Sequence, residues 1–410
     1  MMLCDERLCT GCMACYNICN MDAIKVVVNE KGFQYPEVNN LKCTSCGLCE
    51  NVCPAIHTNQ NYTENPKVFA CWSKNSKTRR DSSSGGIFYE IASCMINSGG
   101  YVCGAAFDET FNVHHIIAQS MPELKQIQGS KYVQSDISAT YRQVENLLKI
   151  GKTVLYSGTP CQIDGIKSYL HIKKVDCEKL YTCDLICHGI PSPKFWDDYK
   201  QNLQKKYKSI LKSYDFRYKE PGWVVFSAYA MFKNGKVYLE STNKDKYLRA
   251  FLYDLIIRDN CQSCKYTNIN RVGDITLADF WGYKNIEGYE NDDKGISLAI
   301  VNTDKGRKLF ELIKEDIVWV EKPISEAING NRSLSKPWPA NEKTEQFWAD
   351  YFKKGYKYVA RKYLVPVKQR KNLGQKVKNT LYFIRIMPNT IVLRIIGNNN
   401  YTKLKRFFRK

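Results

Sequence analysis

The sequence predicts a small α+β domain at the N-terminus, a larger α/β domain behind it, and a basic C-terminal tail that we expect to be helical. Three observations lead to this fold class. A run of four cysteines occurs twice within the first 53 of 410 residues. From residue 67 onwards, short apolar runs alternate with longer amphipathic ones, as in α/β proteins. Basic residues gather at the C-terminal end. The whole chain, with 410 residues of which 44% are hydrophobic, is long enough for more than one folded domain.

The pattern C-x2-C-x2-C-x3-C is repeated at an offset of 34 residues. This spacing is typical of bacterial ferredoxins with two 4Fe-4S clusters, in which the fourth cysteine of each run binds the other cluster. We therefore expect residues 1–56 to form a ferredoxin-like two-cluster domain. The expected ligand sets are Cys9, Cys12, Cys15 and Cys53 for one cluster, and Cys43, Cys46, Cys49 and Cys19 for the other.

Two further features of residues 1–56 fit this interpretation. Gly11 and Gly47 lie inside the cysteine loops, where a missing side chain lets backbone amides approach the cluster. Ala23–Val38 reads as two short strands around a turn at residues 29–32. Zinc sites also use C-x2-C pairs, but a duplicated set of eight cysteines is not a zinc pattern. The N-terminus has no basic or apolar signal region, so we expect a cytoplasmic protein whose thiols stay reduced.

Residues 57–66 contain no aliphatic side chain and are expected to be a linker. The body is expected to span residues 67–335, in two parts with a boundary near residue 150. Its pattern predicts helices and strands in alternation. The predicted helices are Ile87–Ile96, Ala139–Ile150 and one that starts near Lys194; the predicted strands are Tyr101–Phe107, Val113–Ala118 and Thr153–Ser157.

Three loops of the body lead through Gly, Ser or Thr into a predicted helix, at residues 82–86, 158–161 and 188–193. Free amides at helix N-termini bind anions, but the same residues are also ordinary helix caps. Cys161 and Cys187 each lie in a glycine-bearing loop after an apolar strand, and Cys261 and Cys264 form a C-x2-C pair. Together they make a possible third set of four ligands. We interpret five other cysteines as packing residues: Cys71, Cys94, Cys103, Cys177 and Cys183.

Several motifs of the body occur in an order that resembles the beta subunit of the coenzyme F-420-reducing hydrogenase and formate dehydrogenase family, over about residues 67–330. They are Ser83-Ser84-Gly85-Gly86, residues 129–135 (GSKYVQS), residues 158–162 (GTPCQ), residues 184–189 (DLICHG), Tyr218-Lys219 with Gly222-Trp223, Cys261 with Cys264, and Gly273-Asp274 leading to residues 279–282 (DFWG).

The resemblance implies a flavoprotein body that binds FAD and one 4Fe-4S cluster. It implies flavin contacts at nine residues: Ser83, Ser84, Gly85, Gly86, Lys131, Tyr132, Gln134, Gly158 and Thr159. It also implies a cluster on Cys161, Cys187, Cys261 and Cys264. His188 is a candidate catalytic proton donor, with a loop-ordering hydrogen bond as the alternative. Asp274 and Asp279 are candidates either to order the Cys261 loop or to contact the substrate, and we favour the structural role.

A flavin links hydride chemistry to one-electron clusters. The resemblance therefore implies an oxidoreductase that passes electrons from a one-electron carrier such as ferredoxin, through the clusters and FAD, to coenzyme F-420 or another acceptor. Some relatives occur in gene clusters for surface polysaccharides. The alternative is an electron-transfer subunit with no substrate of its own, which relays electrons to a partner oxidoreductase subunit.

The tail, residues 336–410, holds 19 Lys or Arg against three acidic residues, out of a net charge of +20 for the chain. Its basic residues alternate with aromatic and aliphatic ones. This composition suits peripheral attachment to the inner face of a membrane, helices packed on the body, or docking of an acidic partner. Nucleic acid is a weaker alternative, because the first 335 residues carry little net charge.

Overall fold

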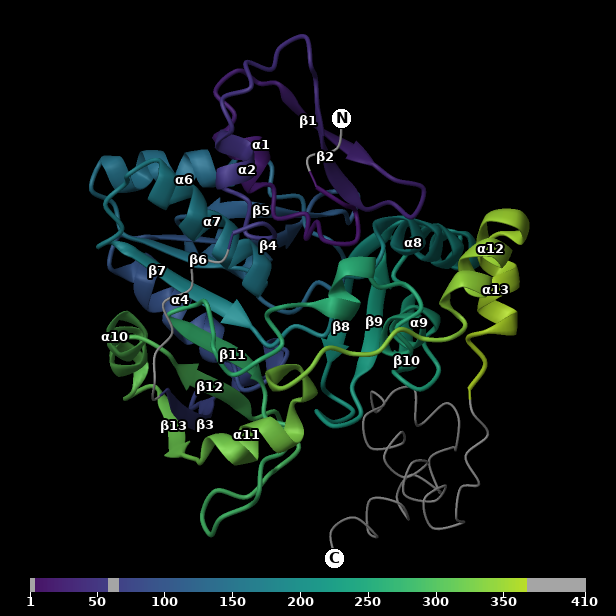
Figure 1. The fold of residues 1–410 in the computed structure, drawn as a ribbon. Coiled ribbons are helices and arrows are strands. Elements are labelled where there is room, and N and C mark those ends of the chain that lie inside the picture. Colours follow the sequence, from purple (N-terminus) through teal and green to yellow (C-terminus); the bar gives the residue numbers. More distant parts are fainter. Residues whose placement is uncertain (1–3, 58–65, 367–410) are drawn as a thin grey trace, which may run out of the picture.

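The computed structural model describes residues 4–57 and 66–366 (Figure 1). The N-terminal domain pairs two short helices with one β-hairpin. Its elements are α1 (Ala14–Ile18), β1 (Ile24–Val28), β2 (Gln34–Val38) and α2 (Leu48–Asn51). The strands are antiparallel, with Ile24 opposite Val38, and the hairpin predicted from the sequence is confirmed. Asn29 closes its turn by accepting hydrogen bonds from the amides of Lys31 and Phe33.

The body is built on an eight-stranded mixed sheet with the order β13-β3-β12-β11-β7-β6-β4-β5. Neighbours from β4 through β6 and β7 to β11 are parallel, and the other neighbouring pairs are antiparallel. The strands are β3 (Lys67–Ser73), β4 (Tyr101–Phe107), β5 (Val113–Ala118), β6 (Val154–Ser157), β7 (Leu180–Leu185), β11 (Ile275–Asp279), β12 (Ser297–Val301) and β13 (Ile317–Glu321).

Helices cover this sheet and bury its apolar side chains. They are α3 (Ser76–Asp81), α4 (Ile87–Asn97), α5 (Met121–Ile127), α6 (Thr140–Lys149), α7 (Pro160–Ile172), α10 (Asp304–Ile313) and α11 (Ile324–Gly330). The predicted helices and strands between residues 87 and 157 are confirmed within a few residues at each end. The sheet takes strands from both sides of residue 150, so the two parts expected there share one sheet.

A three-stranded antiparallel sheet with the order β10-β9-β8 lies beside the large one (Figure 1). Its core is rich in aromatic side chains, with Trp196 and Phe216 almost fully buried. The elements of this region are α8 (Pro193–Tyr207), β8 (Leu211–Tyr218), β9 (Ser227–Phe232), β10 (Val237–Ser241), α9 (Lys246–Leu252), the 3-10 helices η1 (Asp259–Ser263) and η2 (Arg332–Leu334), α12 (Thr344–Lys354) and α13 (Tyr356–Lys362).

The beginning of the expected tail is part of this region. Residues 336–366 include α12 and α13, which lie next to α8 in Figure 1 and bury Phe347, Trp348 and Val359 in the aromatic core. Of the alternatives considered for the tail, packing of helices on the body is therefore confirmed for residues 336–366. The remaining tail, residues 367–410, and most of the expected linker lie outside the described residues.

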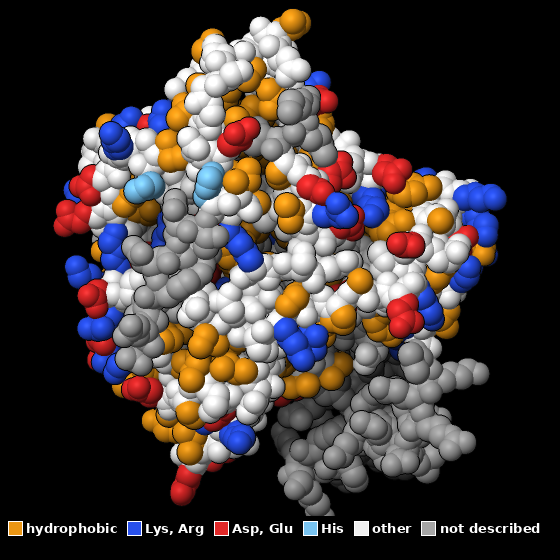
Figure 2. All heavy atoms as spheres, in the orientation of Figure 1, with side chains coloured by type: hydrophobic (Ala, Val, Ile, Leu, Met, Phe, Trp, Pro, Cys, Tyr) orange, Lys and Arg blue, Asp and Glu red, His pale blue; other side chains and the backbone are white. Residues whose placement is uncertain are grey.

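Charges of both signs are interspersed over the face of the body seen in Figure 2. No helix among the described residues is long and apolar enough to cross a membrane.

The order of the parallel strands determines where the loops of the body meet. β6, β7 and β11 run in the same direction, so their carboxyl ends lie at one edge of the sheet. The loop after β6 leads to Cys161, the loop after β7 carries Cys187 and His188, and β11 ends at Asp279. Three motifs that are far apart in the sequence are therefore neighbours in space.

Candidate metal centres

The first predicted ligand set surrounds one cavity. Cys9, Cys12, Cys15 and Cys53 all line it, and it encloses about 350 Å³ of unfilled space, part of it open to solvent. The amide of Gly11 contributes to the lowered pKa of Cys9, and the amide of Ala14 opposes the rise that burial causes in the pKa of Cys12. Amides near the sulfur atoms stabilise thiolates and tune the clusters they bind. The arrangement suits a cubane cluster held by four thiolates.

Cys4 lines the same cavity, although the sequence pattern gives it no role. Its thiol lies close to those of Cys9 and Cys53. The proximity of Cys4, with a smaller contribution from Arg258, lowers the pKa of Cys9 to about 6. Cys4 lies outside the C-x2-C spacing, so no sequence signal placed it here.

The second set is nearer the surface. Cys46 is exposed, while Cys19, Cys43 and Cys49 are partly buried. The amide of Ala23 donates to Cys19 Sγ over 3.3 Å, and that of Ser45 donates to Cys43 Sγ over 3.4 Å. α1 ends next to Cys19 and packs against α2, which carries Cys49. This packing joins the two halves of the sequence repeat.

The third set comes together from three separate loops. Cys161 lies in the first turn of α7, Cys187 follows β7, and Cys261 and Cys264 belong to η1 and its end. Burial raises the pKa of Cys261, and the nearby thiolates of Cys187, Cys161 and Cys264 raise it further. A backbone bridge between Pro191 and Ile257 ties the Cys187 loop to the η1 segment.

Within residues 4–57 and 66–366, no three His, Cys, Asp or Glu side chains are arranged to hold a single metal ion. Cubane ligands need no such arrangement. Each cysteine binds a different iron, so the four sulfur atoms stand apart around the cluster.

The first and third sets are neighbours, and α7 brings them together. Gly165 follows Cys161 by one helical turn and so lies on the same face of α7. A Cβ atom at Gly165 would lie 3.2 Å from Cys12 Sγ. Members of both sets share one apolar cluster with Phe33, Tyr35, Ile190 and Tyr266. Lys265, which follows Cys264, also donates to the carbonyl of Pro54, which follows Cys53.

Two buried arginines lie beside these cysteines, and both keep one nitrogen without a hydrogen-bond partner among the described residues: Nη2 of Arg258 and Nε of Arg271. Burial raises the pKa of Cys161 to about 11, and the charge of Arg258 opposes this rise. Arg271 has the same effect on Cys187, whose pKa burial also raises. Arg271 also pairs with Asp184 over 3.3 Å, whereas Arg258 has no carboxylate partner among the described residues, and a buried cation is costly unless an anion lies nearby. Clusters bound by four thiolates are such anions, so the residues present fit them.

The loop of Ser83 to Gly86 meets the segment that precedes Tyr132. The amide of Ser130 donates to Ser83 Oγ over 2.8 Å. Ser84 Oγ donates to the Ile296 carbonyl, and the Gly85 amide donates to Ser297 Oγ, each over 2.9 Å. Gly86 has a φ of 96° and precedes α4. Several of the polar groups assigned to a flavin therefore also hold the loop itself.

Arg217 is the group of this region best suited to an anionic ligand. It donates to the carbonyl of Ser83 over 3.2 Å and forms an ion pair with Asp279 over 2.9 Å. The residue is 3% exposed, and its Nε has no partner among the described residues. Tyr132 lies close enough for the charge of Arg217 to affect its pKa, which burial raises. A loop at a helix N-terminus beside a buried arginine fits the phosphates of a dinucleotide.

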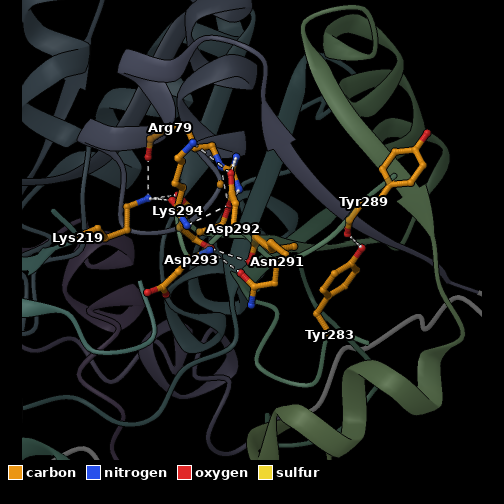
Figure 3. A network of polar contacts seen from close by, with 12 residues as sticks. Arg79, Lys219, Tyr283, Tyr289, Asn291, Asp292, Asp293 and Lys294 are labelled. Atoms are coloured by element: carbon orange, nitrogen blue, oxygen red, sulfur yellow. Dashed lines mark hydrogen bonds and ion pairs between the residues drawn. The ribbon is translucent and has the colours of Figure 1, made fainter. Parts of the chain in front are cut away.

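Below this loop, a polar network joins it to residues 283–295 (Figure 3). Arg79 forms an ion pair with Asp292 over 2.7 Å. Lys219 donates to the carbonyls of Arg79, Ser84 and Lys294. Burial lowers the pKa of Lys219 to about 7. The Tyr218-Lys219 motif thus supports the backbone of the Ser83 loop.

The remaining predicted flavin residues have other contacts. The ammonium of Lys131 donates to three carbonyls at the end of α5, and burial lowers its pKa to about 7. Gln134 Oε1 accepts from the amide of Gln34 over 2.9 Å and so contacts the N-terminal domain. Thr159 caps α7, and its Oγ1 lies 3.2 Å from Cys161 Sγ. Gly158 packs against Gln162.

His188 has a partner that orders its loop. Nε2 lies 2.9 Å from Asp254 Oδ1, and the ring packs between Phe251 and Trp338. This geometry favours the loop-ordering role over that of a proton donor. Asp274 is structural as expected: it accepts from the amide and the hydroxyl of Thr182 and from the hydroxyl of Thr303, over 2.6–2.7 Å.

The duplicated cysteine run and the hairpin define an iron-sulfur electron-transfer protein. Residues 8–56 match the family model described as "4Fe-4S dicluster domain". Residues 151–327 match the model for the C-terminal part of the "Coenzyme F420 hydrogenase/dehydrogenase, beta subunit". The chain therefore carries a segment that matches this beta subunit's C-terminal part behind a segment that matches a dicluster domain, and the resemblance seen in the sequence is confirmed over residues 151–327. The second match begins beside the boundary expected near residue 150.

Among solved structures, a chain of the xenon-derivatised F420-reducing [NiFe] hydrogenase complex from Methanosarcina barkeri is similar to this one. The two share 15% sequence identity with a TM-score of 0.46, over 71% of this chain and 94% of that chain. No curated protein matches the sequence.

Proposed function

We propose that this protein is an iron-sulfur flavoprotein oxidoreductase. It takes electrons from a one-electron donor such as ferredoxin, passes them through three 4Fe-4S clusters to FAD, and delivers them to a hydride acceptor. The acceptor is coenzyme F-420 or another compound, such as an unsaturated intermediate of surface polysaccharide synthesis.

One observation carries the proposal: the first and third cysteine sets meet across α7, where Cys12 Sγ lies next to Gly165. A dicluster domain joined to an unrelated body would have no reason to bring its cluster against four more cysteines. The exposure of the cysteines supports electron transfer from the second set to the first and then to the third. The second set includes the exposed Cys46, while Cys9 of the first set and Cys161 of the third are buried. The second set is then the point of entry for an external carrier.

Aromatic side chains continue from the third set towards the Ser83 loop. His188 follows Cys187, and its ring centroid lies 4.9 Å from that of Phe251. The ring centroid of Phe251 lies 4.9 Å from that of Tyr132. Tyr132 follows Ser130 by two residues, and the amide of Ser130 donates a hydrogen bond to Ser83 Oγ. This continuity supports a flavin at the Ser83 loop, within reach of the third set.

FAD, when bound, would exchange a hydride with the substrate and single electrons with the clusters. The residues of the chain would hold it: Arg217 and the amides of Ser83, Ser84 and Gly86 suit its phosphates, and Tyr132 suits its ring. Arg217 is itself oriented by Asp279, which also accepts a hydrogen bond from Trp223 Nε1 over 2.5 Å.

Anaerobic purification followed by iron, sulfide and flavin analysis tests the proposal. We expect about 12 irons, four for each of three clusters, and about one FAD per chain. A protein with about eight irons and no flavin would refute the assignment of the body. Arg217→Gln should lose most of its FAD and keep its iron, whereas Cys261→Ser should lose about four irons.

The second candidate is an electron-transfer subunit without a substrate of its own. The bond between His188 Nε2 and Asp254 favours it, because it gives the candidate proton donor a structural partner. Reduced protein is mixed with coenzyme F-420, nicotinamides or a candidate acceptor. Reoxidation by one of them supports the enzyme, while reoxidation only after addition of a partner subunit supports the relay.

For residues 367–410, we propose attachment to an anionic membrane surface or docking of an acidic partner, from their basic and aromatic sequence. A variant that ends at residue 366 should lose sedimentation with anionic liposomes in the first case. In the second case, liposome binding is absent from both proteins, and the variant loses affinity for ferredoxin.

A further inference from the structure

Arg258 belongs to the backbone that positions the third cysteine set. Its carbonyl accepts a hydrogen bond from the Cys261 amide over 3.0 Å, and its amide donates to the carbonyl of Ile190 over 2.9 Å. It immediately precedes η1, which carries Cys261. Any displacement of this residue therefore also moves a ligand of the third set.

The side chain of Arg258 leaves the body and contacts the first set. Nε donates to the carbonyl of Cys9 over 3.0 Å, and Nη1 donates to that of Gln34 over 3.0 Å. The guanidinium carbon lies 3.9 Å from the centre of the Tyr35 ring. It also lies against Gly11, where a Cβ atom would be 3.3 Å from it. Gly11 therefore leaves room for this arginine within the cysteine loop.

The charge of Arg258 has no carboxylate to balance it. The residue is fully buried. Arg217 and Arg271 form ion pairs with Asp279 and Asp184. No carboxylate of the described residues forms an ion pair with Arg258, and its Nη2 has no hydrogen-bond partner among them. A buried cation of this kind needs an anion to offset its desolvation. Its charge acts on thiols of both sets, since it contributes to the lowered pKa of Cys9 and opposes the rise that burial causes in the pKa of Cys161.

We propose that Arg258 is a positioning residue shared by the first and third clusters, and that its guanidinium stabilises an added electron on either one. This inference rests on the proposed function. A cluster gains one negative charge on reduction, so a fixed cation in a site of low dielectric constant raises its reduction potential. Because one cation acts on both clusters, it raises both reduction potentials together.

The test is a redox titration of the anaerobic protein, monitored by electron paramagnetic resonance, which resolves the one-electron transitions of the clusters. Arg258→Gln removes the charge. We expect two of the three transitions to become at least tenfold harder to reduce at a fixed potential, a shift of about 59 mV to lower potential for one electron. The third transition, from the second set, stays unchanged.

Arg142→Gln is the matched control. Arg142 also joins the body to the N-terminal domain, through the carbonyls of Asn17, Tyr16 and Cys19. It lies at the second set rather than between the first and third. Its loss should leave the transitions of the first and third clusters unchanged. Equal shifts in both variants would show that docking, not the charge of Arg258, sets the potentials, and would overturn the inference.

Arg258→Lys keeps the charge but withdraws it from Cys9, so the same two transitions should shift by a smaller amount. If Arg258→Gln fails to bind iron, this variant decides: a shift of none or of all three transitions overturns the inference. The proposed function fails separately. Wild-type protein with about eight irons would refute the third cluster, whereas about 12 irons with unchanged potentials in the Arg258 variants would refute only the role of Arg258.

Discussion

Replacement of Gly165 by alanine tests whether the close approach of α7 holds the first cysteine set in place. A methyl group at this position would lie 2.9 Å from the hydroxyl oxygen of Tyr141 and 3.2 Å from Cys12 Sγ. Tyr141 has little freedom to move, because it is fully buried and its hydroxyl donates to the carbonyl of Gln162 over 2.9 Å. The thiol of Cys12 must therefore move away from α7.

Two opposing effects determine the stability of this variant. Alanine in a helix is favoured over glycine by about 1 kcal/mol. Overpacking of a filled core costs about 1–3 kcal/mol, and a contact below 3.0 Å with a rigid ring belongs at the upper end of this range. The net loss should be about 1–2 kcal/mol, or about 2–6 °C in Tm for a domain of this size. Displacement of Cys12 should also reduce the iron content by about four per chain.

The assays are thermal unfolding followed by circular dichroism, and iron analysis of the anaerobically purified variant. His171→Ala is the control, since His171 is exposed near the end of the same helix and its change leaves the cysteines untouched. If Gly165→Ala matches the wild type in both Tm and iron content, then α7 does not constrain Cys12 and the reasoning from its close approach is wrong.

Three other variants address separate parts of the structure. Cys4→Ser should retain all its iron while Cys53→Ser loses about four, because four thiols line the cavity without Cys4; iron loss of equal size in both would make Cys4 a ligand. Burial lowers the pKa of His115 from 6.5 to about 4, so the folded state binds its proton less readily than the unfolded state. Stability that is complete above pH 6.5 is therefore lost as the pH falls towards 4, by about 2 kcal/mol between pH 6.5 and 5. Denaturant midpoints at pH 7.5 and 5 measure this loss, and His115→Phe should reduce it; an unchanged pH dependence in the variant contradicts the assignment. Asp274→Ala leaves the donors of Thr182 unpaired and should cost about 3 kcal/mol in the free energy of unfolding with normal iron content, whereas loss of iron at unchanged stability would indicate a role at the third set.

The local elements of the N-terminal domain and of the body were predictable from the sequence. The hairpin of β1 and β2 follows from a turn between two alternating runs, and α4, α6, β4, β5 and β6 follow from hydrophobic periodicity. The tail was harder to interpret, because the high positive charge of residues 336–410 conceals the apolar faces of α12 and α13. Phe347, Trp348 and Val359 are buried in the same core as α8, while the lysines of α12 and α13 are exposed.

The site was predictable in its residues but not in its arrangement. Periodicity and spacing describe neighbours along the chain, so they identify a C-x2-C pair but give no information about partners a hundred residues away. Cys161, Cys187 and Cys261 meet because β6 and β7 are parallel and a backbone bridge joins Pro191 to Ile257. For Lys131 and Gln134, which the family resemblance assigned to the flavin, the structure gives contacts with the end of α5 and with Gln34.

The sequence by itself determined that this protein binds iron-sulfur clusters, because the ligands of each four-cysteine run lie within a few residues and their spacing is the requirement of the cubane itself. Only the tertiary structure decided that the first and third sets are neighbours. That neighbourhood depends on Gly165 lying one turn after Cys161 and on a buried arginine that reaches from Cys261 to Cys9. Such contacts result from the packing of separate elements, and their geometry exists only once the chain has folded.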